Sequence, residues 1–163
     1  MLLSQPFLFR ESPDGRREVS WRVWVLIWVA PLLFLAAATL MLGYEGWRHL
    51  ASVPNQGEVV RVYAWDGETI FDKGSTNYSP VFRYRFSDGS LTEASAGMSH
   101  PDWNFDIGSV HAIRTFPHVK RNVVLPGWQN WAAGLIVGGI GAVLLPPALW
   151  LTARARRWQR AGA

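Results

Sequence analysis

The stretch SPVFRYRFSDGSL, residues 79–91, alternates apolar and polar side chains and then breaks at an Asp-Gly pair. Alternation with a period of two predicts a strand that has one packed face and one solvated face. We expect the aromatic positions 82, 84 and 86 to face the core, and Arg83 and Arg85 to face solvent. Because Asp-Gly tolerates positive φ, residues 87–90 are predicted to turn the chain into a hairpin with a strand at 91–95.

The same periodicity continues on both sides of this hairpin. GEVVRVYAW at 57–65 predicts an earlier strand, with positions 59, 61 and 63 on one face and positions 60, 62 and 64 on the other. SVHAIRTF at 109–116 predicts a later strand, and NVVL at 122–125 a fifth. The segment 65–77 is rich in turn residues and is expected to be an exposed loop. Together these segments predict a small antiparallel β-sheet or a partly open β-barrel.

Two long apolar runs flank the predicted sheet. Residues 23–42 form a run of twenty and residues 131–151 a run of twenty-one, and neither contains a charge. At about 1.5 Å of rise per residue each covers roughly 30 Å, the thickness of a bilayer's hydrocarbon core. The first run is too long for the apolar part of a signal peptide, and about twenty residues precede it. Two retained transmembrane helices are therefore expected.

Arginine predicts the orientation of these helices. Each tail carries four, whereas the intervening loop of roughly ninety residues carries eight Lys or Arg, which favours both tails in the cytoplasm. The predicted organisation is a cytoplasmic tail at 1–22, helices at 23–43 and 128–152, an extracytoplasmic β domain at 44–127, and a basic cytoplasmic tail at 153–163. The basic residues also favour contact with anionic headgroups.

Tryptophan is abundant and concentrates near the ends of the apolar runs. Amphipathic indoles favour the headgroup region, so these side chains are predicted to be membrane-interface anchors: Trp21, Trp24, Trp28, Trp47, Trp128, Trp131 and Trp150. The alternative is a cofactor or quinone pocket lined by the stripe from Trp21 to Trp28. The interfacial role is favoured, and no cofactor is expected.

The second apolar run carries four glycines within eight residues, at Gly134, Gly138, Gly139 and Gly141. Small residues let helix backbones approach closely in lipid, so we expect a helix–helix contact here. The partner is open: it is residues 23–42 of the same chain, a second copy, or another protein. Neither run contains an ionisable residue, which argues against a transporter or a channel.

Signals for catalysis and for metal binding are weak. The chain has no cysteine, so thiolate metal sites and thiol catalysis are excluded. His100, Asp102 and Asp106 share one loop, but their spacing matches no ligand pattern, and no metal site is expected. The sequence has no GxSxG, no HExxH and no phosphate-binding glycine loop. A basic face interleaved with aromatics is also missing, so neither an enzyme nor a nucleic-acid-binding protein is expected.

Four basic positions of the β domain remain candidates for binding. Arg83 and Arg85 lie on the predicted solvent face, and Lys120 and Arg121 follow the strand at 109–116. The plainer interpretation is a charged face that keeps the sheet soluble and protects its edge. The alternative is a patch that contacts headgroups or an acidic partner.

The order of these features resembles the DUF3592 family of bacterial membrane proteins, whose function is unknown. The resemblance covers roughly residues 45–150 and is carried by the Asp88–Gly89 turn together with Gly57, Val59, Tyr78, Pro80, Phe82, Tyr84, Phe86, Ile107, Gly108 and Val110. It implies a membrane-anchored β domain and supplies no catalytic residue. Residues 1–20 lie outside the match. RTFPHVKRN at 114–122 is basic where the family has an acidic, proline-rich segment.

These observations favour a non-catalytic accessory, assembly or scaffold subunit of a larger bacterial membrane complex. We expect it in the bacterial cytoplasmic (inner) membrane, in contact with lipid and with other membrane subunits or a second copy, and not with nucleic acid. The contact surfaces expected are the glycine face, the segment around Lys120 and Arg121, and the N-terminal tail. The alternative is a stand-alone membrane-anchored module that binds a lipid or envelope ligand through its β domain, and a membrane enzyme ranks third.

Overall fold

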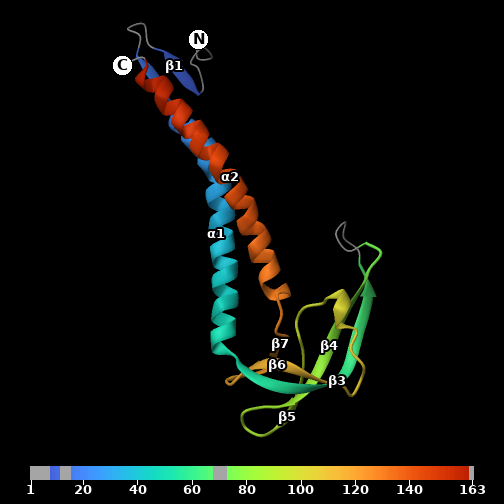
Figure 1. Ribbon diagram of the computed structural model, residues 1–163. Coiled ribbons are helices and arrows are strands. Elements are labelled where there is room, and N and C mark those ends of the chain that lie inside the picture. Colours follow the sequence, from blue (N-terminus) through green and yellow to red (C-terminus); the bar gives the residue numbers. More distant parts are fainter. Residues whose placement is uncertain (1–7, 12–15, 68–72, 162–163) are drawn as a thin grey trace, which may run out of the picture. The chain divides into compact units, whose positions relative to one another are not determined.

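The computed structural model describes residues 8–11, 16–67 and 73–161. The chain divides into two compact units (Figure 1). One is made of Met1–Tyr44 and Trp131–Ala163 and contains most of both long helices. The other is Glu45–Asn130 and contains the β domain.

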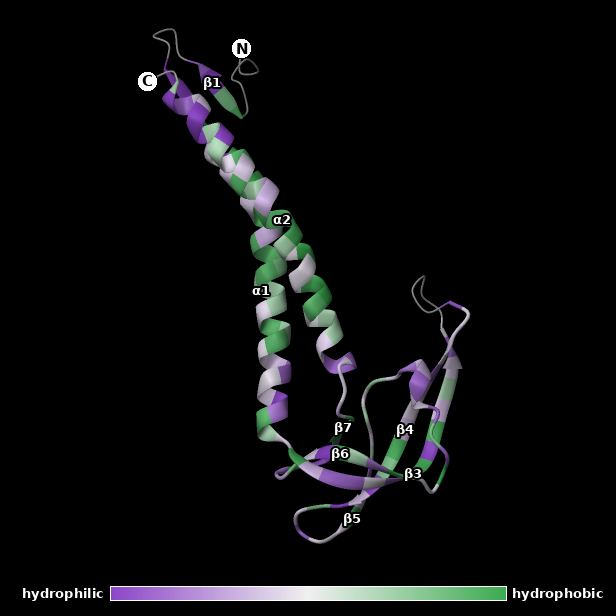
Figure 2. Ribbon diagram, viewed as in Figure 1, coloured by the Kyte–Doolittle hydropathy of each residue, from purple (hydrophilic) through white to green (hydrophobic). Residues whose placement is uncertain are grey.

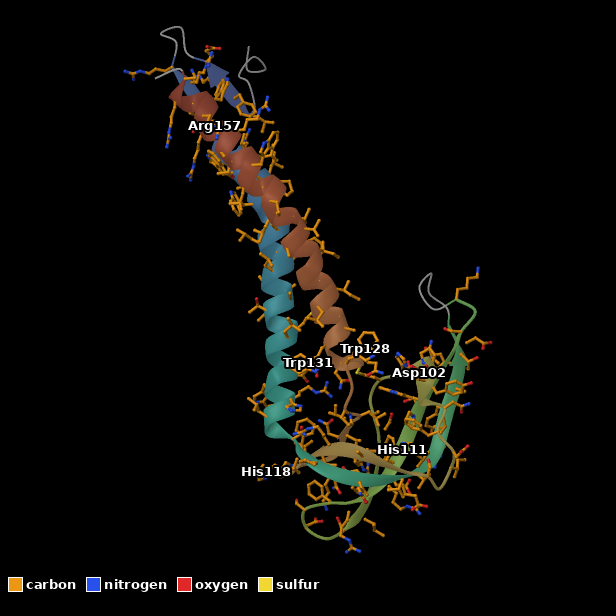
Figure 3. All side chains as sticks on the ribbon, viewed as in Figure 1. Asp102, His111, His118, Trp128, Trp131 and Arg157 are labelled. Atoms are coloured by element: carbon orange, nitrogen blue, oxygen red, sulfur yellow. The ribbon has the colours of Figure 1, made fainter. Side chains whose placement is uncertain are left out.

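The first unit is built on α1 (Trp21–Ala51) and α2 (Gln129–Arg160). Both helices are long and apolar enough to cross a membrane, and Figure 2 shows their apolar middles and polar outer ends. Both extend beyond the predicted spans. α2 continues through Pro146 and Pro147 and on to Arg160, so most of the segment expected to be a tail is helical. The basic side chains at this end therefore project from a helix (Figure 3).

A two-stranded sheet precedes α1, in a segment that sequence analysis left as a tail. β1 (Phe9–Glu11) pairs antiparallel with β2 (Arg17–Val19). The Phe9 ring meets the Trp158 ring of α2 edge-on at a centroid distance of 5.4 Å. The Arg17 guanidinium lies 5.4 Å from the centroid of the same indole. Aromatic and cation–π contacts thus hold the hairpin against α2.

The second unit contains a five-stranded antiparallel sheet in the order β5-β4-β3-β6-β7. Its strands are β3 (Val53–Asp66), β4 (Thr76–Arg85), β5 (Leu91–Ser95), β6 (Val110–Phe116) and β7 (Val119–Val124), with a 3₁₀ turn η1 at Pro101–Trp103. β3 pairs with β6 along its first half and with β4 along its second. The edge strands β5 and β7 contact each other, so the sheet is nearly closed.

The core of this sheet follows the predicted alternation in the central hairpin. Phe82 and Tyr84 are buried and Phe86 is partly buried, whereas Arg83 and Arg85 are exposed, which confirms the predicted faces at these positions. Val81, predicted to share the solvent face of Arg83 and Arg85, is buried instead. The alternation predicted for β3 is wrong beyond Val59. The register with β4 shifts between Val59 and Arg61, so that Val60 is an extra residue. A bulge of this kind reverses which side chains face inward.

Val59 and Val62 therefore both face the core, although sequence analysis placed them on opposite faces. Val59 belongs to the buried cluster, and Val62 packs against that cluster. Arg61, Tyr63 and Trp65 are exposed beyond the bulge. The second half of β3 thus presents polar and aromatic side chains to the outside.

Candidate functional site

The glycine face of α2 packs on α1 of the same chain. A Cβ added at Gly134 would lie 2.7 Å from Cδ2 of Leu42, and one added at Gly141 would lie 3.1 Å from the main-chain nitrogen of Leu35. Gly138 faces Ala38 in the same way. Gly139 points away, because an added Cβ would meet nothing within 4 Å. Three of the four predicted contact glycines therefore bring the two helices together, and that face is occupied within the chain.

The predicted tryptophan anchors divide into two groups. Four of them have the exposed side chains that an interfacial role requires: Trp21, Trp47, Trp128 and Trp150. Trp24, Trp28 and Trp131 are partly buried. Nε1 of Trp28 donates a hydrogen bond of 3.1 Å to Oγ1 of Thr152. Trp28 is thus a helix–helix contact as well, because a buried indole N–H needs an acceptor.

Two of the four predicted basic side chains, Arg85 and Lys120, bind residues of the β4–β5 turn. Nζ of Lys120 lies 2.6 Å from Oδ2 of Asp88 and also donates to Oγ of Ser90. Nη1 of Arg85 donates to the main-chain carbonyl of Gly89. The Lys120 contact lowers the pKa of the Asp88 carboxyl well below its ordinary range, and two hydrogen bonds from Ser90 add to the effect. These groups link the β4–β5 turn to the start of β7.

Arg83 and Arg121 lie together in an open cleft of about 560 Å³, here named the Arg121 cleft. The other side chains that line it are Leu91, Thr92 and Glu93 of β5. Nε and Nη2 of Arg83 donate to Oε1 of Glu93 at 3.0 and 2.7 Å, across the paired strands β4 and β5. Two guanidinium groups and one carboxylate leave the cleft with a net charge of +1.

Arg121 is the distinctive residue of this cleft. Its φ is +62°, the only positive value among the non-glycine residues that the structure describes. An L-residue in this left-handed region costs about 1–2 kcal/mol. Within the described part of the chain its guanidinium makes no ion pair and no hydrogen bond, and the residue is exposed. Strained residues of this kind concentrate at binding sites, where the surrounding structure holds them.

The Arg121 cleft covers the seam between the edge strands. β5 and β7 contact each other, yet no strand ladder joins them among the described residues. Beneath the seam, the Tyr84 hydroxyl is buried and points toward the backbone N–H groups of Arg121 and Asn122 without reaching good hydrogen-bond geometry. Burial raises the pKa of Tyr84 above its ordinary value. Tyr84 therefore lies beneath the peptide that carries Arg121.

A serine–histidine pair also occurs in the β domain. Oγ of Ser109 lies 2.9 Å from Nε2 of His111 and 2.6 Å from the main-chain carbonyl of Asp106. The His111 ring stacks on Phe105 at 4.0 Å. A working nucleophile needs a base that is itself oriented by a third group. Within the described residues no carboxylate binds this ring, and the arrangement fits a polar contact that closes the turn before β6.

The loop histidine predicted near the acidic pair has a local structural role. Nδ1 of His100 accepts a hydrogen bond from the main-chain nitrogen of Asp102 and so caps η1. His118 lies far from both Asp102 and His111 (Figure 3). Among the described residues no three His, Asp or Glu side chains gather closely enough to hold a metal ion.

Comparisons of the chain with models of protein families, with curated proteins and with solved structures gave no match. The resemblance to the DUF3592 family stays a prediction. Function is therefore inferred from geometry and charge alone.

Sequence reasoning singled out Arg83 and Arg121 but not the side chains that complete their cleft. Thr92 and Glu93 belong to β5, which was predicted only as the partner of β4. The register Arg83↔Glu93 centres the turn on Asp88, whereas a two-residue Asp88–Gly89 turn would place Arg83 opposite Ala94, so the turn sequence alone does not predict this ion pair. The approach of Arg121 to β5 is not predictable either, because it depends on closure of the sheet.

Proposed function

We propose that this chain is an integral protein of the bacterial cytoplasmic membrane and a non-catalytic accessory, assembly or scaffold subunit of a larger complex. Both helices cross the bilayer, the termini are cytoplasmic, and the β domain is extracytoplasmic. The β domain binds an acidic segment of another subunit in the Arg121 cleft. The observation that carries the proposal is Arg121 itself, a strained arginine in a cleft of net positive charge, whose guanidinium has no ion pair or hydrogen bond within the described part of the chain.

Membrane insertion is supported by the surface of the helices. Large apolar side chains on both are exposed, among them Leu26, Leu33, Leu40, Ile136 and Val143. A soluble protein rarely exposes so large a contiguous apolar surface. In lipid the same surface is solvated, and the glycine contact supplies the close packing that holds the helices together.

A protein partner in the cleft is supported by elimination among the expected contact surfaces. The glycine face of α2 is used by α1, and the N-terminal hairpin packs on Trp158. Lys120 is paired with Asp88. Arg83 is paired with Glu93, so among the described residues of the cleft the guanidinium that remains available is that of Arg121. A guanidinium binds a carboxylate through two parallel hydrogen bonds, which suits an Asp or Glu side chain.

The second candidate is a stand-alone module that binds an envelope ligand, and one observation favours it. Tyr63 and Trp65 are exposed on the same face of β3, two residues apart. Nη1 of Arg61 donates to the Tyr63 hydroxyl at 2.8 Å, which orders that ring. Exposed aromatic side chains on a rigid strand can stack on the apolar faces of a ligand. This surface is separate from the residues that line the Arg121 cleft, so the two candidates can be tested apart.

Affinity purification of the tagged full-length chain from native membranes in a mild detergent tests the proposal. Wild type is expected to co-purify with one defined complex in fixed stoichiometry. Arg121→Glu changes the net charge of the cleft from +1 to −1 and is expected to lose the partner. Arg85→Glu makes the same change in charge outside the cleft and should retain it. A wild-type chain that stays partnerless under these conditions would contradict the accessory-subunit proposal and favour the envelope-ligand candidate.

A further inference from the structure

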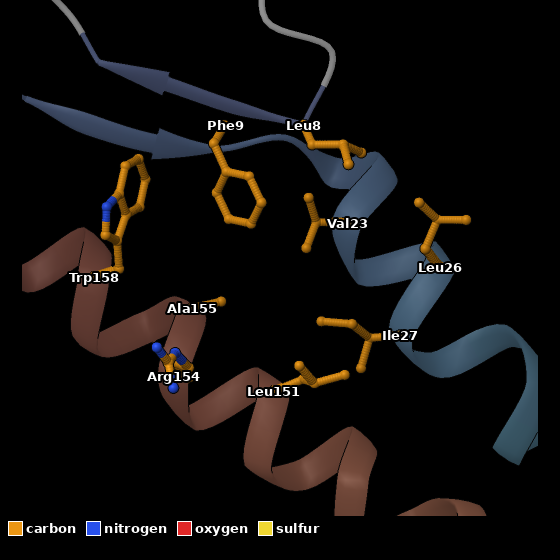
Figure 4. A pocket seen from close by; sticks show the side chains of 9 residues that line it. All are labelled: Leu8, Phe9, Val23, Leu26, Ile27, Leu151, Arg154, Ala155 and Trp158. Atoms are coloured by element: carbon orange, nitrogen blue, oxygen red, sulfur yellow. The ribbon is translucent and has the colours of Figure 1, made fainter.

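A second pocket lies in the helical unit, between the β1–β2 hairpin and the ends of α1 and α2 (Figure 4). Its volume is about 560 Å³, within the usual range for small-ligand sites. The lining is almost wholly apolar, with contributions from the start of β1 and from both helices, among them Leu8, Phe9, Val23, Ile27, Leu151 and Trp158. A pocket of this character takes a hydrocarbon chain.

Among the described residues, Arg154 is the one charged side chain that lines this pocket. Its guanidinium lies 5.3 Å from the centroid of the Trp150 ring, one helical turn earlier, and the indole holds it in place. Arg154 makes no ion pair and no hydrogen bond among the residues that the structure describes, so its donors are available. A hydrocarbon chain in the pocket thus has a cationic hydrogen-bond donor beside it.

The charge around the pocket selects an anionic ligand. The described segments 8–11, 16–22 and 154–161 carry eight arginines, and their carboxylates are Glu11 and Glu18. Glu11 is paired with Arg17 at 3.1 Å. The pocket also lies where the uncharged runs end, since Val23 opens one run and Leu151 closes the other. In a bilayer this is the depth at which acyl chains meet headgroups.

We propose that this pocket binds one acyl chain of an anionic glycerophospholipid whose phosphate accepts hydrogen bonds from Arg154. The inference rests on the proposed membrane insertion but not on the Arg121 cleft. The apolar lining requires the acyl chain, so a free phosphate or a soluble headgroup is a poor ligand. The cationic surroundings and the forked donors of Arg154 favour a lipid with net negative charge over a zwitterionic one.

Native mass spectrometry of the full-length chain in detergent tests this site directly. The probes are phosphatidylglycerol and phosphatidylcholine with the same acyl chains, and glycerol phosphate as the headgroup without a chain. Wild type is expected to bind one phosphatidylglycerol in preference to phosphatidylcholine, and glycerol phosphate should not compete. Arg154→Gln is expected to weaken phosphatidylglycerol binding by roughly tenfold, the effect of one charge-assisted hydrogen bond.

Two further variants separate the pocket from diffuse charge effects. Arg156→Gln makes the same change in charge at a residue that does not line the pocket, and its effect should be much smaller. Ala155→Trp places a large ring at a buried lining position and should abolish binding while leaving Arg154 intact. Equal losses in Arg154→Gln and Arg156→Gln would overturn the proposal in favour of general attraction between arginines and anionic lipid.

The remaining outcomes are also informative. A chain that retains no lipid selectively, or that holds a second protein chain against this surface, would overturn the site. Alkaline washing of native membranes distinguishes this failure from failure of the proposed function. If the chain resists extraction but shows no headgroup preference, only the lipid site is wrong. If it is washed off, membrane insertion itself is wrong.

Discussion

The guanidinium of Arg114 on β6 donates a hydrogen bond of 2.8 Å to the main-chain carbonyl of His49, in the last turn of α1. The same group donates to the carbonyl and the hydroxyl of Ser52, at 2.6 and 2.8 Å. Carbonyls at a helix C-terminus have no partner within the helix, and they carry its partial negative charge. Arg114 therefore caps α1 and ties its last turn to the sheet.

Replacing Arg114 with alanine should lower the free energy of unfolding of the β domain by about 2 kcal/mol or more, because partly buried carbonyls lose a charged donor. Arg114→Lys should recover only part of this, since an ammonium cannot reach both residues as a planar fork does. Denaturant unfolding of the full chain in detergent micelles measures the change. Arg85→Ala is the control, because it removes one hydrogen bond at an exposed turn. Equal losses of unfolding free energy in Arg114→Ala and Arg85→Ala would show that the cap on α1 stabilises the fold no more than one exposed turn hydrogen bond.

The helix pair offers a direct chemical test, because the chain has no cysteine of its own. An added Cβ at Gly138 would lie 3.3 Å from Cβ of Ala38, close to the separation in a disulfide. The variant with cysteine at both positions should form an intrachain disulfide on mild oxidation. In that background Gly141→Leu should sharply reduce the cross-linked fraction, since an added side chain meets the α1 backbone at Leu35.

Gly139→Leu is the matched control for this measurement. It makes the same glycine-to-leucine substitution two residues before Gly141, but an added Cβ at Gly139 meets nothing within 4 Å. Its cross-linked fraction should equal that of the unmodified pair. Dimeric rather than intrachain product on a non-reducing gel would show that the glycine face joins two copies instead.

The strands could be predicted because their signal is local. Burial of alternate side chains requires alternate apolar residues, and Phe82 and Tyr84 stand out for that reason. The bulge at Val60 could not be predicted, since an inserted residue leaves no mark in composition. The interpretation of β3 therefore failed from that point onward, and Val62 was placed on the wrong face.

The candidate site was predictable only in part, and the reason is its dependence on tertiary structure. Exposure of Arg83 follows from strand alternation. The left-handed backbone of Arg121 and its approach to β5 depend on how the edge strands meet. The N-terminal hairpin had a weak local signal, the Pro-Asp-Gly sequence at 13–15. The contact of Phe9 with Trp158 joins opposite ends of the chain, and no local pattern reports it.

The ion pair between Asp88 and Lys120 should make stability depend on pH in acid. The Lys120 contact holds the folded-state pKa of Asp88 below its value in the unfolded chain, which is about 3.9. The contribution is therefore fully present above the unfolded pKa and is lost as the pH falls through the folded one. The free energy of unfolding of wild type should exceed that of Asp88→Asn at about pH 5, and this difference should disappear as the pH is lowered to about 2.

Lys120→Met supplies the control for this pH dependence. In the Lys120→Met background, the difference in free energy of unfolding between the chain with Asp88 and its Asp88→Asn variant should be smaller than in wild type. The reason is that the contact that contributes most to the lowered pKa of Asp88 is gone. High salt should shrink it as well, since both side chains are about half exposed. Unfolding curves for the four combinations of residues at 88 and 120 measure the coupling. A pH dependence that survives Lys120→Met undiminished would assign it to the Ser90 hydrogen bonds instead.

Replacing Arg121 with glycine should separate stability from function. Glycine adopts φ near +60° at no steric cost, so the substitution relieves strain and should raise the free energy of unfolding by about 1 kcal/mol. It also removes the guanidinium, and partner capture should be lost. Arg121→Ala removes the same group but keeps the strain, so it should lose the partner without gaining stability. A gain in stability together with a loss of binding is the trade-off expected where a strained residue is kept for its function.

Denaturant unfolding and co-purification on both variants measure the two effects. Retained capture in Arg121→Gly would show that the partner does not use this side chain, and a less stable glycine variant would show that the arginine packs on the seam.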